Sequence, residues 1–422
     1  MGNLNLKLLI LIFSISSTLF GQSKKPLNIL FLGNSYTAAN NLSAMVSDMA
    51  NNTGDSINQS NLTGGGQTLW NHAANNSPSM NEINTGLWDI IVLQEQSQIP
   101  SFTEAEVENY FYPAVKYIDS AILAANPCAK TMLYMTWGRK YGDNMNCPNW
   151  PPVCTYNGMD SLLKKRYLKA AHDNGNIVSP VGAVWHYLRN KHPEIELYEA
   201  DNSHPSFIGT YTTAACMYTT LFKKSPQNFN IKYHLDDSTI LKIKNAIDSV
   251  VLPNSDLWNL DVYDVKSQFS YNNKNDTFQF NNKSKNAIQY FWDFGDGDTS
   301  SLKNPKHIFK SGKYTIQLIV SSCEHSDTSK ISIQFQNTDI RNIANKEIEV
   351  YPNPTNNFLN LHLKEGFESI ALRNDLGQIL YPKLQNNLEL VTLDLSQIPS
   401  GIYTLHIIQD NKISFKKIMV LH

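Results

Sequence analysis

The sequence lacks an excess of charge of either sign, because 35 Lys and Arg residues face 37 Asp and Glu residues, for a net charge of -2. Nucleic-acid-binding proteins usually present a basic face, so this balance gives no support for a nucleic-acid partner. After the first residues there is also no apolar run long enough to cross a bilayer, and we expect no membrane span. Cysteine is scarce and shows no metal-site spacing, and we expect neither a metal ion nor another cofactor.

The N-terminus has the pattern of a secretory signal peptide. A lysine precedes a short apolar core at residues 8–13, and small residues follow up to Gly21. This core is too short for a transmembrane helix. We therefore predict a signal peptide at residues 1–21 and an exported mature protein.

Five cysteines in an exported chain leave at least one thiol unpaired within the monomer. Cys147 and Cys154 bracket a Pro-rich loop and can close it by a disulfide, although the sequence does not decide whether they pair. Cys128, Cys216 and Cys323 are interpreted as buried small hydrophobic residues.

Apolar runs alternate with helical patterns through the first 252 residues. Compact runs at 28–33, 88–93 and 130–137 predict strands, and the spacing at 42–50, 103–125 and 240–251 predicts helices. Continuous apolar strands between helices indicate a parallel sheet covered on both faces, with ligands collecting beyond the carboxyl ends of the strands. Ser35, Gln94 to Ser97, and Trp137 to Tyr141 all fall at that edge.

Two polar segments at this edge suggest nucleophilic catalysis. Ser35 stands where a strand passes into a helix, so its hydroxyl can project from the sheet edge. Asp201 lies three residues before His204, close enough to accept the imidazole Nδ1–H and leave Nε2 free to take a hydroxyl proton. Either segment alone is also typical of a helix cap, and together they support each other.

These segments resemble the SGNH or GDSL hydrolases over residues 26–252. Gly33-Asn34-Ser35 stands in the nucleophile block, with Asn34 in place of the usual Asp, and Asp201-x-x-His204-Pro205 matches the closing block. The resemblance implies a three-layer α/β/α, flavodoxin-like parallel sheet. It also implies that Ser35 is the nucleophile, His204 the general base and Asp201 its orienting carboxylate.

The resemblance further implies an oxyanion hole built from three donors. The Ser35 N–H is the first, and the Gly64-Gly65-Gly66 cluster supplies the second, from Gly65 or Gly66. The third block, usually Gly-x-Asn-Asp, reads Gln94-Glu95-Gln96-Ser97 here and has no Asn. Gln96 by strand length, or Gln94 by similarity to sialate and xylan acetylesterases, can offer a side-chain amide instead.

Further residues are candidates for the site or for structural roles near it. Trp137 and Arg139 follow the third apolar strand and are candidates for a substrate pocket, with a buried Trp and a solvated Arg as the alternative. His72, His172, His186 and His192 lack matching partners and are interpreted as structural or surface residues. Glu95 has no paired carboxylate, which argues against a glycosidase.

Two β-rich segments follow, joined by predicted linkers at 253–265 and 338–345. Residues 266–337, with Tyr290 to Thr299 at their centre, resemble a PKD domain. Trp292 and Phe294 there can anchor a β-sandwich core. The acidic turn that follows them is interpreted as structural, with a calcium loop as the alternative. Residues 346–422 resemble the C-terminal sorting domain of the type IX secretion system. The resemblance implies that the machinery of this system is a partner of the chain. It also implies export through the periplasm and outer membrane to the cell surface or medium.

The sequence therefore predicts an α/β esterase domain followed by two immunoglobulin-like sandwiches. The predicted substrate is an acetyl or short acyl ester on extracellular carbohydrate. Alternatives are a lipid or thioester hydrolase, or a catalytically weakened glycan-binding or adhesive surface protein.

Overall fold

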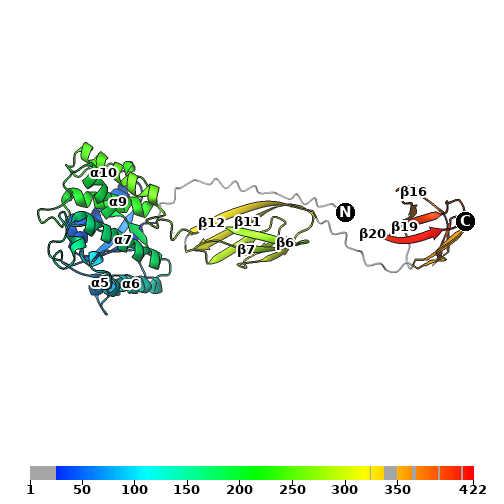
Figure 1. Cartoon of the computed structure of the whole chain (residues 1–422), viewed down its shortest axis with the longest axis horizontal. Helices are drawn as coiled ribbons and strands as arrows, with labels where there is room; N and C mark the ends of the chain where they lie inside the picture. The colour runs from blue at the N-terminus through cyan, green and yellow to red at the C-terminus, as the bar shows by residue number, and fades with distance from the viewer. Residues whose placement is uncertain (1–24, 324, 337–348, 364–366, 388–389, 410–411) are drawn as a thin grey trace, which may run out of the picture. The chain divides into compact units, whose positions relative to one another are not determined.

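The computed structural model describes residues 25–323, 325–336, 349–363, 367–387, 390–409 and 412–422 (Figure 1). The predicted signal peptide at 1–21 and the predicted linker at 338–345 lie outside these residues. Within them, no helix is long and apolar enough to cross a membrane.

A five-stranded parallel sheet forms the centre of the N-terminal α/β unit, coloured blue to green in Figure 1. Its strands are β1 (Leu27–Gly33), β2 (Ile57–Thr63), β3 (Ile90–Leu93), β4 (Lys130–Tyr134) and β5 (Ile177–Ser179). They lie in the order β2-β1-β3-β4-β5, with every neighbouring pair parallel. This is the flavodoxin-like order, and the predicted fold class is confirmed.

Helices cover both faces of this sheet. They are α1 (Ser35–Ala38), α2 (Leu42–Asn52), α3 (Leu69–Ala73), α4 (Pro78–Asn84), α5 (Glu104–Tyr110), α6 (Tyr112–Ala125), α7 (Tyr156–Asn174), α8 (Val181–Lys191), α9 (Phe207–Phe222) and α10 (Asp237–Val250). Helices pack in two groups: α9 contacts α2, α8 and α10, and α6 contacts α3, α4 and α7. Because both faces are covered, β3 is buried along its whole length, which is why its sequence is a continuous apolar run.

The helical pattern at 103–125 is two helices rather than one. Helix α5 ends at Tyr110, and α6 begins at Tyr112 with Pro113 in its first turn. Proline has no backbone N–H and is tolerated at the start of a helix but not inside it. Pro113 therefore divides the segment.

Two small β-sandwich units follow. The first contains β6 (Phe269–Lys274), β7 (Thr277–Asn282), β8 (Gln289–Asp293), β9 (Thr299–Ser300), β10 (Lys306–Ile308), β11 (Gly312–Ser322) and β12 (His325–Phe335). They form the sheets β10-β7-β6 and β12-β11-β8-β9. Trp292 and Phe294 are buried in this unit, as the sequence predicted.

The second sandwich contains β13 (Val350–Tyr351), β14 (Phe358–His362), β15 (Ser369–Arg373), β16 (Ile379–Leu380), β17 (Lys383–Asn387), β18 (Leu390–Asp394), β19 (Gly401–Gln409) and β20 (Lys412–Val420). Its sheets are β13-β14-β18-β17 and β16-β15-β19-β20. Alternate residues such as Leu359 and Leu361 are buried, which is the pattern of strands with one face on a core.

Four of the five cysteines form disulfides. Cys147 and Cys154 form a disulfide, which settles the pairing that the sequence left open. Cys128 and Cys323 form a second one across 195 residues, so the interpretation of these two as buried thiols is wrong. Cys216 is the free cysteine of the described residues and is buried, as expected.

Candidate active site

The turn after β1 places Ser35 at the carboxyl edge of the sheet. Asn34 caps α1, and its Oδ1 accepts the N–H of Tyr36 at 3.1 Å. A Cβ at Gly33 would lie 2.2 Å from Thr37 Oγ1 and 2.6 Å from Gln94 Oε1, so only glycine fits there. The tight turn therefore depends on residue 33 having no side chain.

Asp201, His204 and Ser35 form a continuous hydrogen-bonded chain. His204 Nε2 lies 2.8 Å from Ser35 Oγ, and His204 Nδ1 bonds to Asp201 Oδ2. Asp201 Oδ1 also accepts the N–H groups of Ser203 at 3.0 Å and His204 at 2.9 Å, which fixes the carboxylate on this turn. The structure thus joins the three residues that the sequence proposed for catalysis.

The carboxylate of Asp201 is held in its ionised form. Partial burial works to raise its pKa, but the hydrogen bonds from the His204 ring and from the Ser203 and His204 N–H groups outweigh burial and lower the pKa below its usual value. An ionised carboxylate accepts the Nδ1–H and leaves Nε2 as the acceptor facing Ser35. This is the tautomer that a general base requires.

A stack of three aromatic rings packs against the turn that carries His204. The Tyr36 ring stacks on Trp137 at 4.9 Å, and Trp137 stacks on Trp185 at 3.6 Å. Trp137 Nε1 donates to the carbonyl of Ser203 at 3.1 Å, and Tyr36 Oη bonds Ser203 Oγ at 2.6 Å. Trp137 is completely buried, which matches the alternative of a buried Trp rather than a residue that lines a substrate pocket, and it packs against the His204 turn.

Gln94 holds the nucleophile turn. It is fully buried, and its Oε1 accepts the N–H of Asn34 and the hydroxyl of Thr37, both at 2.9 Å. Its Nε2 donates to the carbonyl of Glu95. Both ends of this amide are therefore used inside the protein, a role that the sequence did not predict. One of the two Nε2 protons is left over, and Gln94 as a side-chain donor to an oxyanion stays a prediction.

Gln96 folds onto its own loop. Its Oε1 accepts the N–H groups of Gln98 at 2.8 Å and Ile99 at 3.2 Å, and its Nε2 donates to Gln98 Oε1 at 3.1 Å. An amide nitrogen carries two protons, and one of them is left over. Gln96 as the side-chain donor to an oxyanion stays a prediction.

The glycine loop starts level with the nucleophile turn, because Thr63 pairs with Gly33 in the β1–β2 register. Asn34 Nδ2 donates to the carbonyl of Gln67 at 3.0 Å and ties the two loops together. The usual Asp has no proton to donate there, which gives a physical reason for Asn at position 34. Gly65 and Gly66 face open space, and their N–H groups stay predicted donors.

His72 lies behind the nucleophile turn. Its Nε2 bonds the carbonyl of Gly33 at 2.9 Å and its Nδ1 bonds Ser79 Oγ at 2.6 Å. Burial lowers its pKa, against the opposing effect of the Gly33 hydrogen bond, and favours the neutral ring. Because a carbonyl can only accept, Nε2 carries the proton, and His72 is a structural support for the turn.

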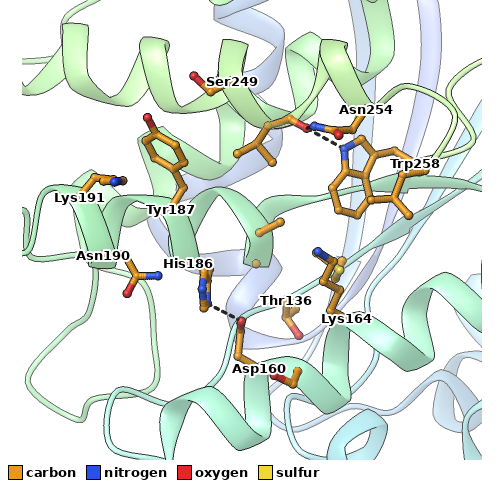
Figure 2. Close-up of a pocket in the computed structure, with 16 residues that line it drawn as sticks. Thr136, Asp160, Lys164, His186, Tyr187, Asn190, Lys191, Ser249, Asn254 and Trp258 are labelled. Carbon is orange, nitrogen blue, oxygen red and sulfur yellow. Dashed lines mark hydrogen bonds and ion pairs between the residues drawn. The ribbon is translucent and has the colours of Figure 1, made fainter.

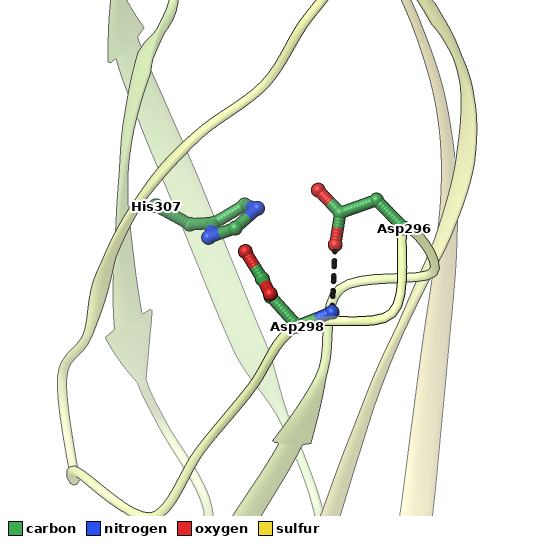
Figure 3. Close-up of side chains that lie close together, drawn as sticks. All are labelled: Asp296, Asp298 and His307. Atoms are coloured by element: carbon green, nitrogen blue, oxygen red, sulfur yellow. Dashed lines mark hydrogen bonds between the residues drawn. The ribbon is translucent and has the colours of Figure 1, made fainter.

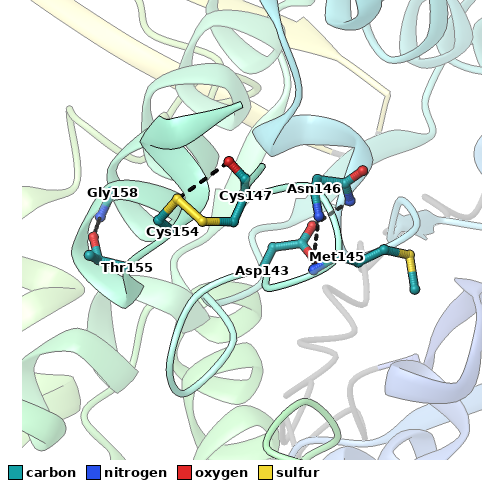
Figure 4. Close-up of a disulfide and its surroundings, with 7 residues drawn as sticks. All are labelled: Asp143, Met145, Asn146, Cys147, Cys154, Thr155 and Gly158. Atoms are coloured by element: carbon teal, nitrogen blue, oxygen red, sulfur yellow. Dashed lines mark hydrogen bonds between the residues drawn. A yellow bond between two sulfur atoms is a disulfide. The ribbon is translucent and has the colours of Figure 1, made fainter. Parts of the chain in front are cut away.

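Arg139 belongs to a loop organised by a buried aspartate. Asp143 accepts hydrogen bonds from Gln98 Nε2 at 2.7 Å and Asn146 Nδ2 at 2.6 Å, and Arg139 Nη1 lies 3.4 Å from it. The Cys147–Cys154 disulfide closes the same loop (Figure 4). Arg139 is a quarter exposed, and its role in a substrate pocket stays a prediction.

A cavity of about 450 Å³ lies away from this chain of residues (Figure 2). Side chains of α7, of α8 and of residues 249–258 line it, and Ser35, Asp201 and His204 are not among them. His186 there bonds Asp160 at 3.0 Å, and this bond raises the pKa of His186. The catalytic edge and this cavity are separate features of the α/β unit.

The described residues bring one group of three metal-ligating side chains together, in the first sandwich (Figure 3). Ligand atoms of Asp296, Asp298 and His307 lie within 4.8 Å of one another, and both carboxylates are exposed. Asp296 Oδ1 also accepts the N–H of Asp298 at 3.1 Å, which is the structural role predicted for this acidic turn.

Two parts of the chain match known families. Residues 268–336 match the PKD domain, and residues 349–421 match the secretion system C-terminal sorting domain. No curated protein matches the chain.

Solved structures resemble parts of the chain. A DUF4886 family protein from Bacteroides uniformis is 16% identical over 54% of this chain and 95% of its own, with a TM-score of 0.46. A candidate SGNH hydrolase from Slackia heliotrinireducens is 25% identical over 47% of this chain and 100% of its own, with a TM-score of 0.39. The PKD1 domain of the metalloprotease PrtV from Vibrio cholerae is 28% identical over 17% of this chain and 98% of its own, with a TM-score of 0.17.

The sorting domain implies handling by the type IX secretion machinery and export to the cell surface or medium. The order of the five parallel strands is the flavodoxin-like one. The chain is therefore an exported protein in which an α/β domain of this fold precedes a PKD domain and a C-terminal sorting domain.

Proposed function

We propose that the chain is an exported serine esterase that acts through an acyl-serine intermediate. The observation that carries this proposal is the hydrogen-bonded chain from Asp201 through His204 to Ser35. Nucleophile, base and orienting group stand in the order that hydrolysis of an ester by serine requires.

The reaction follows from this geometry. Ser35 Oγ attacks the ester carbonyl while His204 Nε2 takes its proton, and the alcohol leaves with that proton as the acyl-serine forms. A water molecule then attacks the acyl group with His204 again as base, which releases the acid and restores Ser35. The N–H groups of Ser35 and of Gly65 or Gly66, with the amide of Gln96 or of Gln94, are the proposed donors to the oxyanion.

We propose acetyl or short acyl groups on extracellular carbohydrate as the substrate. Export supports this class, and so does an exposed aromatic pair close to the nucleophile turn. Trp70 and Tyr117 are both exposed, and their ring centroids lie 6.1 Å apart. Trp70 follows Gln67 by three residues, and the carbonyl of Gln67 accepts a hydrogen bond from Asn34 in the nucleophile turn. Exposed aromatic faces can stack on the apolar faces of sugar rings.

Fluorophosphonate labelling of the full-length protein tests the catalytic part. We expect an adduct on Ser35 that is lost in Ser35→Ala, and turnover of p-nitrophenyl acetate that nearly disappears in His204→Ala while thermal unfolding stays the same. Absence of the adduct on folded protein would favour the weakened binding protein instead.

A pair of substrates tests the carbohydrate part. Trp70→Ala should raise KM for an acetylated polysaccharide and leave kinetics with p-nitrophenyl acetate unchanged, because the small ester does not reach the aromatic pair. Faster turnover of long-chain than of acetyl esters would favour the lipid hydrolase.

A further inference from the structure

Glu95 is a buried carboxyl group between the two glutamines of the third block. Its side chain is completely excluded from solvent. Oε1 accepts two backbone N–H groups, from Leu69 at 3.1 Å and from Gln96 at 2.6 Å, and Oε2 has no hydrogen-bond partner among the described residues. A buried polar atom without a partner is costly, so its retention needs an explanation.

The two N–H groups belong to the two loops that carry proposed oxyanion donors. Leu69 is the first residue of α3 and directly follows the glycine loop, which ends at the capping residue Thr68. Gln96 is the residue whose amide is the proposed side-chain donor. One carboxyl oxygen therefore sets the spacing between these loops, while Gln94 next to it holds the turn that bears Ser35.

Little around Glu95 offsets a negative charge. No Lys, Arg or His of the described residues forms an ion pair with it; the titratable group facing it is Tyr167 of α7, whose pKa is raised by burial first and by the charge of Glu95 second. Burial raises the pKa of Glu95 to about 7, against the opposing effect of the Gln96 and Leu69 N–H groups. The carboxyl group thus changes charge near neutral pH.

We infer that Glu95 is a positioning residue of the proposed esterase, whose ionised carboxylate holds the glycine loop and residue 96 with their donors facing the Ser35 oxyanion. This inference rests on the proposed function. Hydrogen bonds to an ionised acceptor are roughly twice as strong as those to a neutral one, so protonation loosens both loops while Oε1 stays in place. The loops matter most when charge develops on the oxyanion, and the effect therefore falls on kcat rather than on KM.

The pH profile of kcat/KM distinguishes this role from simple packing. In the wild type, protonation of Glu95 lowers kcat/KM about tenfold in addition to the loss that follows when the base cannot take the Ser35 proton, so the slope of log kcat/KM against pH should exceed one between about pH 8 and pH 6. In Glu95→Gln the side chain keeps an acceptor of the same shape but no longer titrates. The slope should not exceed one, and kcat at pH 8 should drop about tenfold with KM nearly unchanged.

Asp119→Asn is the matched control. Asp119 is also a buried carboxyl group, and its pKa is raised by burial, but it bonds Asn176 just before β5, at the opposite end of the sheet from Ser35. This variant should keep the wild-type slope above one. An equal slope in wild type and Glu95→Gln, or a slope of one in the wild type, would overturn the inference.

Labelling of Ser35 in the same samples separates the two proposals. If fluorophosphonate forms the adduct and the slopes are equal, the inference about Glu95 fails and the esterase remains. If no adduct forms on folded protein, the proposed function itself fails. Should Glu95→Gln not fold, the wild-type slope alone decides.

Discussion

Glu95 should also make the stability of the protein depend on pH. Its pKa is raised by burial to about 7 in the folded protein, from 4.5 for an ordinary Glu. The folded state therefore keeps a proton that the unfolded chain releases, so this contribution to stability is complete below about pH 4.5 and is lost as pH rises through 7. A difference of about 2.5 pKa units corresponds to about 3 kcal/mol.

The assay is urea unfolding of wild type and Glu95→Gln at pH 5 and pH 8.5. The variant carries no titrating group at position 95, so its free energy of unfolding relative to wild type should rise by about 2.5 kcal/mol between the two pH values. Glu108→Gln, which changes an exposed carboxylate on α5, should show no such rise. A constant difference between wild type and Glu95→Gln would refute the reasoning, because it would mean that Glu95 is ionised in the folded protein throughout this range.

Three further substitutions test the support of the site. Trp137→Phe keeps an aromatic ring between Tyr36 and Trp185 but loses the N–H that donates to the Ser203 carbonyl. We expect the free energy of unfolding to fall by about 1 kcal/mol and kcat to be lower. Unchanged kinetics would contradict the supporting role of Trp137. Asn34→Asp removes the proton donated to Gln67 and should lower kcat about tenfold at constant KM, whereas wild-type turnover would show that this bond does not hold the loop. Cys147→Ser removes the disulfide that closes a short loop. The free energy of unfolding should fall by about 2 kcal/mol, and residues 147–154 should become sensitive to protease. Equal resistance to digestion would show that other contacts hold the loop closed.

The sheet and the Asp201–His204 pair could be predicted because their signals are local. Strand β3 reads as buried from its own residues, and an Asp three residues before a His reaches the ring within one turn. The nucleophile needed the family resemblance as well, since a Ser in such a turn is also typical of a helix cap.

The features that were missed depend on residues far apart in the sequence. Gln94 contacts Asn34 across 60 residues, and no local pattern shows that its carbonyl end faces the turn. For Trp137 the sequence left a pocket residue and a buried one as alternatives, and only the packing of α8 against it decides between them. The partner of Cys128 lies 195 residues away, a pairing that spacing alone does not give.

The Cys128–Cys323 disulfide has a consequence for how the protein breaks apart. The bond is a second covalent connection across the segment between residues 128 and 323. A single proteolytic cut in that segment therefore yields two fragments that still migrate as one species on a denaturing gel. They separate only after a reductant is added, so that outside the cell, where disulfides persist, the fragment that carries Ser35 stays attached to the fragment that carries Cys323.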